Sequence, residues 1–322
     1  MTPTESRPAQ LKEIAPDLIK RNDDNPRLFF REEEMDLLIR SIKRYGIQVP
    51  ITVYQEGSHF VLIDGERRWR SARKLNLRRI PAIVQPKPSP LENLLLMFNI
   101  HALREQWDYF TIANKLPDVQ RRYTREHGKE ASEAELSEAT GLTRGQIRRC
   151  MLLLDLPQKY RDALVQELSL PKRMQKLSED LFIEMERALK TVQNRVPGAV
   201  KDLDKVRDSL IGKFRKGSIK NVTELRMLSK MATAVDNLGI KETKAKESLS
   251  EIFDAHNSIG IEEVYEERFG LKYDERKVTL SLEAIINYLE NIAISEGELE
   301  SGNPLRKPLK ALKRLIDRVL GD

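Results

Sequence analysis

The chain has 322 residues, enough for two or three domains with separate cores, and 56 Lys and Arg against 50 Asp and Glu give it a net charge of +6. That mild excess suits nucleic acid or phosphate partners, while 1 cysteine and 4 scattered histidines exclude an internal disulfide and argue against a metal cluster. No apolar run approaches the ~18 residues of a membrane span, and the polar start "MTPTESRPAQ" lacks a signal peptide's hydrophobic core, so we expect a cytoplasmic protein without a membrane partner.

Residues 10–86 predict a compact mixed α/β unit. "EEEMDLLIRSIKRYG" carries apolar residues at helical spacing, and Gly46 follows as a typical helix end. "VPITVYQEGSHFVLIDG" contains two runs rich in Val, Ile and Phe around "QEGS", which predicts a hairpin of two strands. "ERRWRSARKLN" then predicts a second helix, and "RIPAIVQ" a further strand before the proline-rich break "PKPSP".

The second predicted helix carries a dense group of basic residues directly after an Asp-Gly turn. With successive residues about 100° apart, Trp69, Ala72 and Leu75 share one face, which we expect to pack against the core. The basic residues on the opposite, solvent-facing side are Arg67, Arg70 and Lys74.

Arg68 lies close to the apolar face, so its guanidinium needs a partner, because burying an unpaired charge is costly. One interpretation is an internal ion pair with Asp64 or Glu66. The other is a bound phosphate, because backbone N–H groups at a helix start attract anions, Gly65 permits close approach, and arginine grips oxygens bidentately. Both interpretations remain open at this level.

"SEAELSEATGLTRGQIRRCMLLLDLP" has the organisation of a helix-turn-helix. Ser132 and Glu135 predict a capping box, Gly141 makes the turn, and Cys150 faces the core. Arginine can contact guanine and glutamine adenine in a major groove, and the alternative is an ordinary helical hairpin with a solvated basic face. The residues that we expect to contact DNA are Thr143, which also caps the second helix, Arg144, Gln146, Arg148 and Arg149.

From Leu91 onward the patterns are helical and are separated by short turns, except that "KVTLSL" alternates and predicts a short strand. In the last predicted helix an apolar stripe runs beside basic residues. Packing within the chain and self-association through this stripe are the two alternatives. The stripe consists of Leu309, Leu312, Ile316 and Val319.

Three segments carry a resemblance to a known family: "NPRLFFREEEMDLLIRSIKRYGIQVPITV", "GERRWRSA" and "RIPAIV". They resemble the N-terminal domain of ParB-type chromosome and plasmid partition proteins, whose hallmark is a GERR-x-RA box. The resemblance runs in one order from about Leu11 to Pro157. It implies an α+β ParB-like domain at residues 1–90, an all-α helix-turn-helix domain at 91–160 and an all-α C-terminal domain at 161–322 that is a candidate for oligomerisation.

The resemblance implies a site for CTP, or another nucleotide, with Mg²⁺. The first motif of the family falls on Asn25 and Arg27. The triphosphate cradle falls on Gly65, Glu66, Arg67 and Arg68. The third motif falls on "FNIHALRE", with Asn99 as the residue on the metal side and Arg104 as its basic partner. Phe98 replaces a glutamate that the family associates with hydrolysis, so we expect weak CTPase activity at most, and no catalytic residue is assigned.

The function implied is a sequence-specific DNA-binding protein that uses CTP with Mg²⁺ as a conformational switch for clamping DNA in plasmid or chromosome partition. Its expected partners are double-stranded DNA with a palindromic site, a second copy of the chain and a partition ATPase, at the nucleoid or on a plasmid. Two alternatives stay open. One is a transcriptional or phage or plasmid regulator with a vestigial pocket, and the other is a kinase or nuclease on the same fold.

Overall fold

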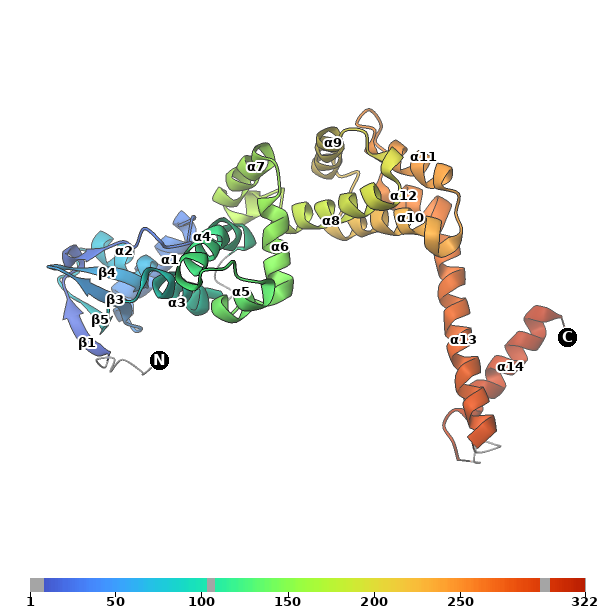
Figure 1. The fold of residues 1–322 in the computed structure, drawn as a ribbon, viewed down its shortest axis with the longest axis horizontal. Coiled ribbons are helices and arrows are strands. Elements are labelled where there is room, and N and C mark those ends of the chain that lie inside the picture. Colours follow the sequence, from blue (N-terminus) through green and yellow to red (C-terminus); the bar gives the residue numbers. More distant parts are fainter. Residues whose placement is uncertain (1–8, 103–107, 296–301, 322) are drawn as a thin grey trace. The chain divides into compact units, whose positions relative to one another are not determined.

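A computed structural model describes residues 9–102, 108–295 and 302–321 (Figure 1). It contains an N-terminal mixed α/β domain followed by a long all-helical region, as predicted. The sheet has five strands in the order β1-β5-β3-β4-β2, with β1 paired antiparallel to β5, β3 antiparallel to β4, β3 parallel to β5, and β2 parallel to β4. The strands are β1 (Gln10–Ile14), β2 (Ile19–Lys20), β3 (Ile51–Glu56), β4 (His59–Asp64) and β5 (Ile80–Gln85).

Two helices, α1 (Glu32–Tyr45) and α2 (Glu66–Lys74), pack against each other, and α2 also contacts β3. Trp69 and Ala72 of α2 are buried against the strands, as the helical spacing predicted, and the Trp69 indole donates to the Pro16 carbonyl over 2.9 Å. Leu75, just beyond the helix, is half-buried. The core of the domain therefore fixes the start of α2 at the end of β4.

The remaining helices follow in chain order (Figure 1). They are α3 (Pro90–Ala102), α4 (Tyr109–His127), α5 (Glu133–Thr140), α6 (Arg144–Leu154), α7 (Gln158–Ser169), α8 (Glu179–Arg195), α9 (Leu203–Lys216), α10 (Leu225–Leu238), α11 (Glu242–Phe253), α12 (Ile261–Tyr265), α13 (Leu271–Ser295) and α14 (Arg306–Leu320). Short 3-10 turns lie at Pro16–Leu18, Lys172–Met174, Pro197–Ala199 and Val222–Glu224, and a π-helical segment lies at Glu266–Gly270.

The predicted strand "KVTLSL" is wrong, because these residues lie within α13. Val278, Leu280 and Leu282 are 58%, 53% and 39% exposed. An isolated strand among helices would leave its backbone N–H and C=O groups without partners, whereas a helix satisfies them internally. Six alternating residues are too short a signal to override that requirement.

The chain packs as two compact units, one made of residues 1–190 and 214–226 and the other of residues 191–213 and 227–322. Of the site residues predicted from the sequence, all those that the structure describes lie in the first unit. In the second unit, Ile316 and Val319 of α14 are 40% and 81% exposed, so packing within the chain covers only part of the predicted stripe. No helix among the described residues combines the length and the apolar character that crossing a membrane demands.

Candidate functional site

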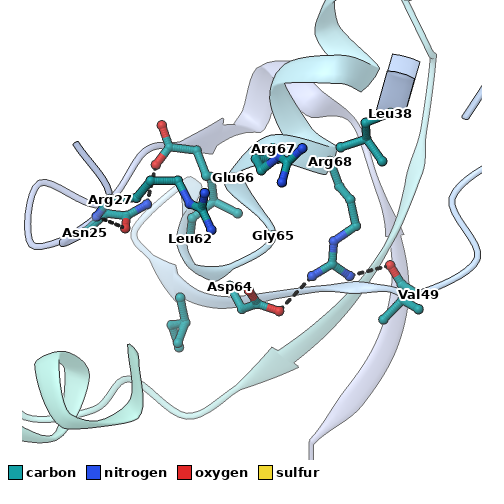
Figure 2. Close-up of a pocket in the computed structure, with 11 residues that line it drawn as sticks. Asn25, Arg27, Leu38, Val49, Leu62, Asp64, Gly65, Glu66, Arg67 and Arg68 are labelled. Atoms are coloured by element: carbon teal, nitrogen blue, oxygen red, sulfur yellow. Dashed lines mark hydrogen bonds and ion pairs between the residues drawn. The ribbon is translucent and has the colours of Figure 1, made fainter. Parts of the chain in front are cut away.

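A cavity of about 300 Å³ lies where β4 runs into α2 (Figure 2). Asn25 and Arg27 reach it from the loop that precedes α1, and the "GERR" segment reaches it from the start of α2. Six of the residues predicted as a nucleotide site thus share one cavity. The lining residues are Asn25, Arg27, Leu38, Val49, Leu62, Ile63, Asp64, Gly65, Glu66, Arg67 and Arg68.

Gly65 shapes the floor of this cavity. It is the N-cap residue of α2 in a left-handed conformation, with φ of 95°, and, having no side chain, it does not itself cap the first turn of the helix. A Cβ atom at this position would lie 2.6 Å from Ile51 Cγ2 and 3.1 Å from Arg68 Nη2. A glycine is therefore required, and it leaves room for an anion to approach the N–H groups at the helix start.

Arg68 is held within the protein. Its Nη2 donates to Asp64 Oδ2 over 2.7 Å, and its Nη1 donates to the carbonyls of Val49 and Pro50 over 2.6 Å each. The ion-pair interpretation of Arg68 is therefore confirmed, with Asp64 as the partner (Figure 2). A phosphate would have to replace one of these acceptors.

Glu66 joins the loop before α1 to helix α2. Its buried carboxylate accepts hydrogen bonds from Asn25 Nδ2 over 2.5 Å and from the Arg70 guanidinium over 2.5 and 2.7 Å. Asn25 Oδ1 in turn accepts from the Arg27 backbone N–H over 3.0 Å. Glu66 is therefore placed to position Asn25 and Arg27.

Arg27 and Arg67 supply the positive charge of the cavity. Burial lowers the pKa of Arg27, and the nearby Arg67 charge lowers it further. Arg67 donates to the Glu34 carbonyl over 3.2 Å and lies 3.6 Å from the Glu34 carboxylate. Two guanidinium groups that repel each other favour a bound anion, which would reduce that repulsion.

A second, more polar cavity of about 470 Å³ adjoins the first, because Arg27 and Arg67 line both. Glu179, at the start of α8, borders it and accepts a hydrogen bond from the Phe110 backbone N–H. Burial raises the pKa of Glu179 to about 7, and the neighbouring Asp108 carboxylate contributes to the rise. This glutamate changes its charge near neutral pH.

Phe98 and Asn99 of the third predicted motif lie outside the lining of the first cavity. Asn99 does not appear among the described residues that line the first cavity, and its Nδ2 donates to the carbonyls of Leu95 and Ala139 over 3.0 and 3.1 Å. Ala139 belongs to α5, so Asn99 supports the helix-turn-helix. Phe98 is fully buried. Arg104 lies outside the described residues, and the metal role of Asn99 stays a prediction.

The predicted helix pair is present as α5 and α6, and the capping box of Ser132 and Glu135 is confirmed. Gly141 makes the turn with φ of 73°, and a Cβ there would lie 2.7 Å from Asn99 Oδ1. Cys150 is fully buried, and burial raises the pKa of its thiol to about 12, as expected for a core residue. The turn between the helices is thus fixed by α3.

The five residues expected to contact DNA differ in their surroundings. Thr143 and Gln146 form a second capping box, with Gln146 Oε1 accepting from the Thr143 N–H over 2.8 Å. Arg149 pairs with Asp180 and lies over the Tyr109 ring, 4.7 Å from its centre. Arg144 is exposed, and Arg148 is also largely exposed although it lies 3.3 Å from Glu133. The spacing T-x-x-Q could have revealed the second capping box from sequence.

Known proteins resemble the part of the chain that holds this site. A family model described as the ParB N-terminal domain matches residues 2–96. The chromosome-partitioning protein ParB of Myxococcus xanthus is 43% identical over 67 residues, which are 21% of this chain and 23% of that protein. ParB of Caulobacter vibrioides is 26% identical over 167 residues, 48% of this chain and 49% of that protein.

Two solved structures of C-terminally truncated ParB from Caulobacter crescentus are also similar. One is complexed to the centromeric parS site and has 20% identity, a TM-score of 0.43 and coverage of 68% of this chain and 98% of that one. The other is complexed with CTP-gamma-S and has 22% identity, a TM-score of 0.29 and coverage of 55% and 92%. The chain spans about half the length or less of the curated relatives it matches. It carries a ParB N-terminal domain and is a distant homologue of chromosome-partitioning ParB proteins over about half its length.

Proposed function

We propose that this chain binds a nucleoside triphosphate, CTP before others, in the cavity at Gly65 and binds specific DNA through α5 and α6, as part of chromosome or plasmid partition. The observation that carries the nucleotide proposal is the left-handed Gly65 with no room for a Cβ, at a helix start beside Arg27, Arg67 and Arg68. Backbone N–H groups and arginines at a helix start are what a polyphosphate requires.

We further propose that a magnesium ion arrives with the nucleotide. Mg²⁺ is commonly held by one or two carboxylates together with phosphate oxygens. Asp64 and Glu66 bring carboxylates to the cavity, and a Mg²⁺ ion would have to share Asp64 with Arg68, and Glu66 with Asn25 and Arg70. Among the described residues no group of three or more His, Cys, Asp and Glu side chains could hold a metal without a ligand. A bound Mg²⁺ would neutralise phosphate charge that these two acids would otherwise repel.

The DNA proposal depends on α6. Arg144 lies at its N-terminal end and Arg148 one turn later, and both are exposed, so the two guanidinium groups are available to base edges or phosphates. Thr143 and Gln146 hold the start of the helix through their capping box. We propose that Arg149 orients α6 through Tyr109 and Asp180.

Calorimetric titration of CTP and ATP with MgCl₂ into the full chain, with and without a DNA duplex selected from a random pool, tests both parts. We expect Arg68→Ala to weaken CTP binding roughly 10-fold or more, because a charged hydrogen bond contributes about 1.5–3 kcal/mol. The exposed Arg78 lies outside the cavity, so Arg78→Ala is the control and should leave the affinity unchanged.

If neither nucleotide binds at millimolar concentration, the nucleotide-binding proposal fails. The three protein acceptors of Arg68 favour one alternative, a DNA-binding regulator with a vestigial pocket. DNA binding without nucleotide binding would select that alternative.

A further inference from the structure

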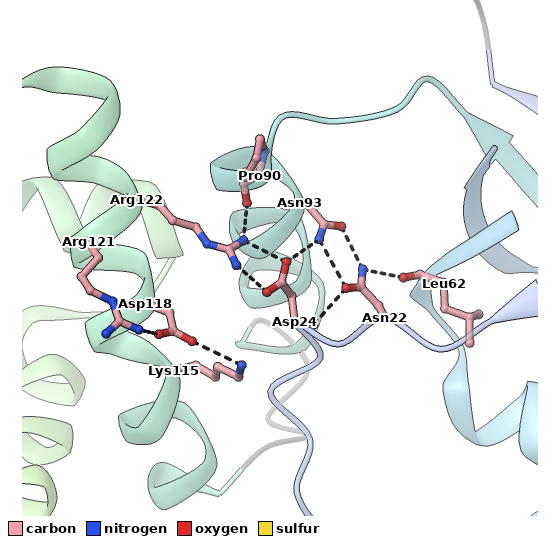
Figure 3. Close-up of polar contacts among 9 residues, drawn as sticks. All are labelled: Asn22, Asp24, Leu62, Pro90, Asn93, Lys115, Asp118, Arg121 and Arg122. Atoms are coloured by element: carbon pink, nitrogen blue, oxygen red, sulfur yellow. Dashed lines mark hydrogen bonds and ion pairs between the residues drawn. The ribbon is translucent and has the colours of Figure 1, made fainter. Parts of the chain in front are cut away.

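A buried polar network links the loop of the cavity to two helices (Figure 3). Asn22 and Asn93 are 7% and 5% exposed, and their carboxamides lie side by side, with Asn22 Nδ2 donating to Asn93 Oδ1 over 3.0 Å. Asn22 Nδ2 also donates to the Leu62 carbonyl of β4 over 2.7 Å. Because buried amide groups are costly without partners, this pair fixes the loop onto both β4 and α3.

Asp24 connects the same loop to α4. Its carboxylate receives two hydrogen bonds from the Arg122 guanidinium, over 2.5 and 2.9 Å, and one from Asn93 Nδ2 over 3.2 Å. Arg122 also donates to the Pro90 carbonyl at the start of α3 over 2.7 Å. The pair is half-buried and bidentate, so displacing either partner would leave a poorly solvated charge.

Both ends of this network lead to proposed binding sites. On one side, Asn25 follows Asp24 directly and lines the cavity with Arg27. On the other side, α4 packs against α6, where the Cys150 thiol lies 3.7 Å from the Tyr109 carbonyl. Helix α3 also reaches the helix-turn-helix, through the hydrogen bond from Asn99 to the Ala139 carbonyl.

We propose that the Asp24–Arg122 ion pair, together with the Asn22–Asn93 pair, positions the Asn25–Arg27 segment and transmits the occupancy of the cavity to α5 and α6. The inference rests on the proposed function and adds the residues through which its two sites are coupled. A satisfied buried network has few alternative arrangements, so we expect a ligand that moves Asn25 or Arg27 to act through the adjacent Asp24 on α3 and α4 or to weaken the ion pair.

The test measures the coupling between the sites in the full chain. The dissociation constant of CTP with MgCl₂ is measured with and without the selected DNA duplex, and that of the duplex with and without CTP. The ratio of the paired constants is the coupling factor, which must be the same in both directions and is typically about 5–150. We expect Asp24→Asn and Arg122→Gln each to bring it to within about 2-fold of unity, with the double variant no worse than either alone.

Arg121→Gln is the matched control. Arg121 precedes Arg122 on α4, is 76% exposed on its side chain and pairs with Asp118 (Figure 3). We expect this variant to keep the full coupling factor. DNA affinity without nucleotide should change less than 3-fold in every variant, which separates lost coupling from lost folding.

Each result supports or overturns the inference. Coupling retained in both Asp24→Asn and Arg122→Gln would overturn it, as would an equal loss in Arg121→Gln. A wild-type chain that binds CTP and DNA without coupling would overturn it while leaving the proposed function intact. A wild-type chain that binds no nucleotide would overturn both.

Discussion

Gly65→Ala tests the closeness of α2 to the sheet at the cavity. Ile51 is fully buried, and a Cβ at position 65 would lie 2.6 Å from its Cγ2 and 3.0 Å from its Cβ. A left-handed conformation costs about 1–2 kcal/mol for a residue with a side chain. Overpacking of a core costs a further ~1–3 kcal/mol. We therefore expect Gly65→Ala to lower the free energy of unfolding by about 2–5 kcal/mol.

Gly57→Ala is the matched control, because Gly57 also has a positive φ, of 61°, in the turn between β3 and β4, but nothing lies within 4 Å of an added Cβ. We expect it to lose only the ~1–2 kcal/mol of backbone strain. Urea unfolding followed by the fluorescence of the buried Trp69, in a Trp107→Phe background, reports on this domain. Equal losses in the two variants would refute the close approach of α2 to Ile51.

Three further outcomes are expected. The folded-state pKa of Glu179, about 7, lies above its ordinary 4.5, so the wild type should lose up to about 3 kcal/mol of stability as the pH rises between these values. Glu179→Gln should remove this loss. The expectation is wrong if urea unfolding gives the same difference in stability between the two proteins at pH 4.5 and at pH 8. Lys213 is buried and donates to the Ile252 and Ile259 carbonyls and to Asn257 Oδ1 over 2.7–3.0 Å. Lys213→Met should therefore lower the free energy of unfolding by roughly 3 kcal/mol. A loss as small as that of the exposed Lys216→Met would contradict the contribution of these bonds. The Cys150 thiol should react with a thiol reagent only after denaturation, and rapid modification of the native chain at pH 8 would disagree with its burial and raised pKa.

Short-range patterns predicted much of the N-terminal domain. The hairpin, the two helices and the strand before "PKPSP" all follow from periodicity and turn residues within about 15 positions, and the structure confirms them. The strands β1 and β2 were not foreseen. Four of the five residues of β1 are exposed at the edge of the sheet, and β2 has only two residues, so neither shows the alternation of a half-buried strand.

The residues of the candidate site also divide into those close together in sequence and those that meet only through folding. Gly65 and its neighbours are adjacent in sequence, so they lie together at the cavity, but the local pattern left an ion pair and a phosphate site open, and Asn25 and Arg27 were assigned only through the resemblance. Asn99 and the partners of Arg122 depend on how distant helices pack, and Asp24 lies 98 positions from Arg122. No local spacing carries that information, because side chains so far apart meet only after the helices have docked.

The density of basic residues on α2 does not by itself locate an anion site, because acids within the same domain neutralise most of that charge. Arg68 pairs with Asp64, and Arg70 pairs with Glu66 while lying over the Phe30 ring. Their charge is therefore largely balanced before any ligand arrives. Arg67 also has an acid nearby, the Glu34 carboxylate at 3.6 Å, but it lies near the buried Arg27 as well, whose pKa falls through burial and through the repulsion between the two charges. An anion gains most where it relieves such repulsion, so we propose that Arg27 and Arg67, one from each segment of the cavity, add to the phosphate position at Gly65 and Arg68.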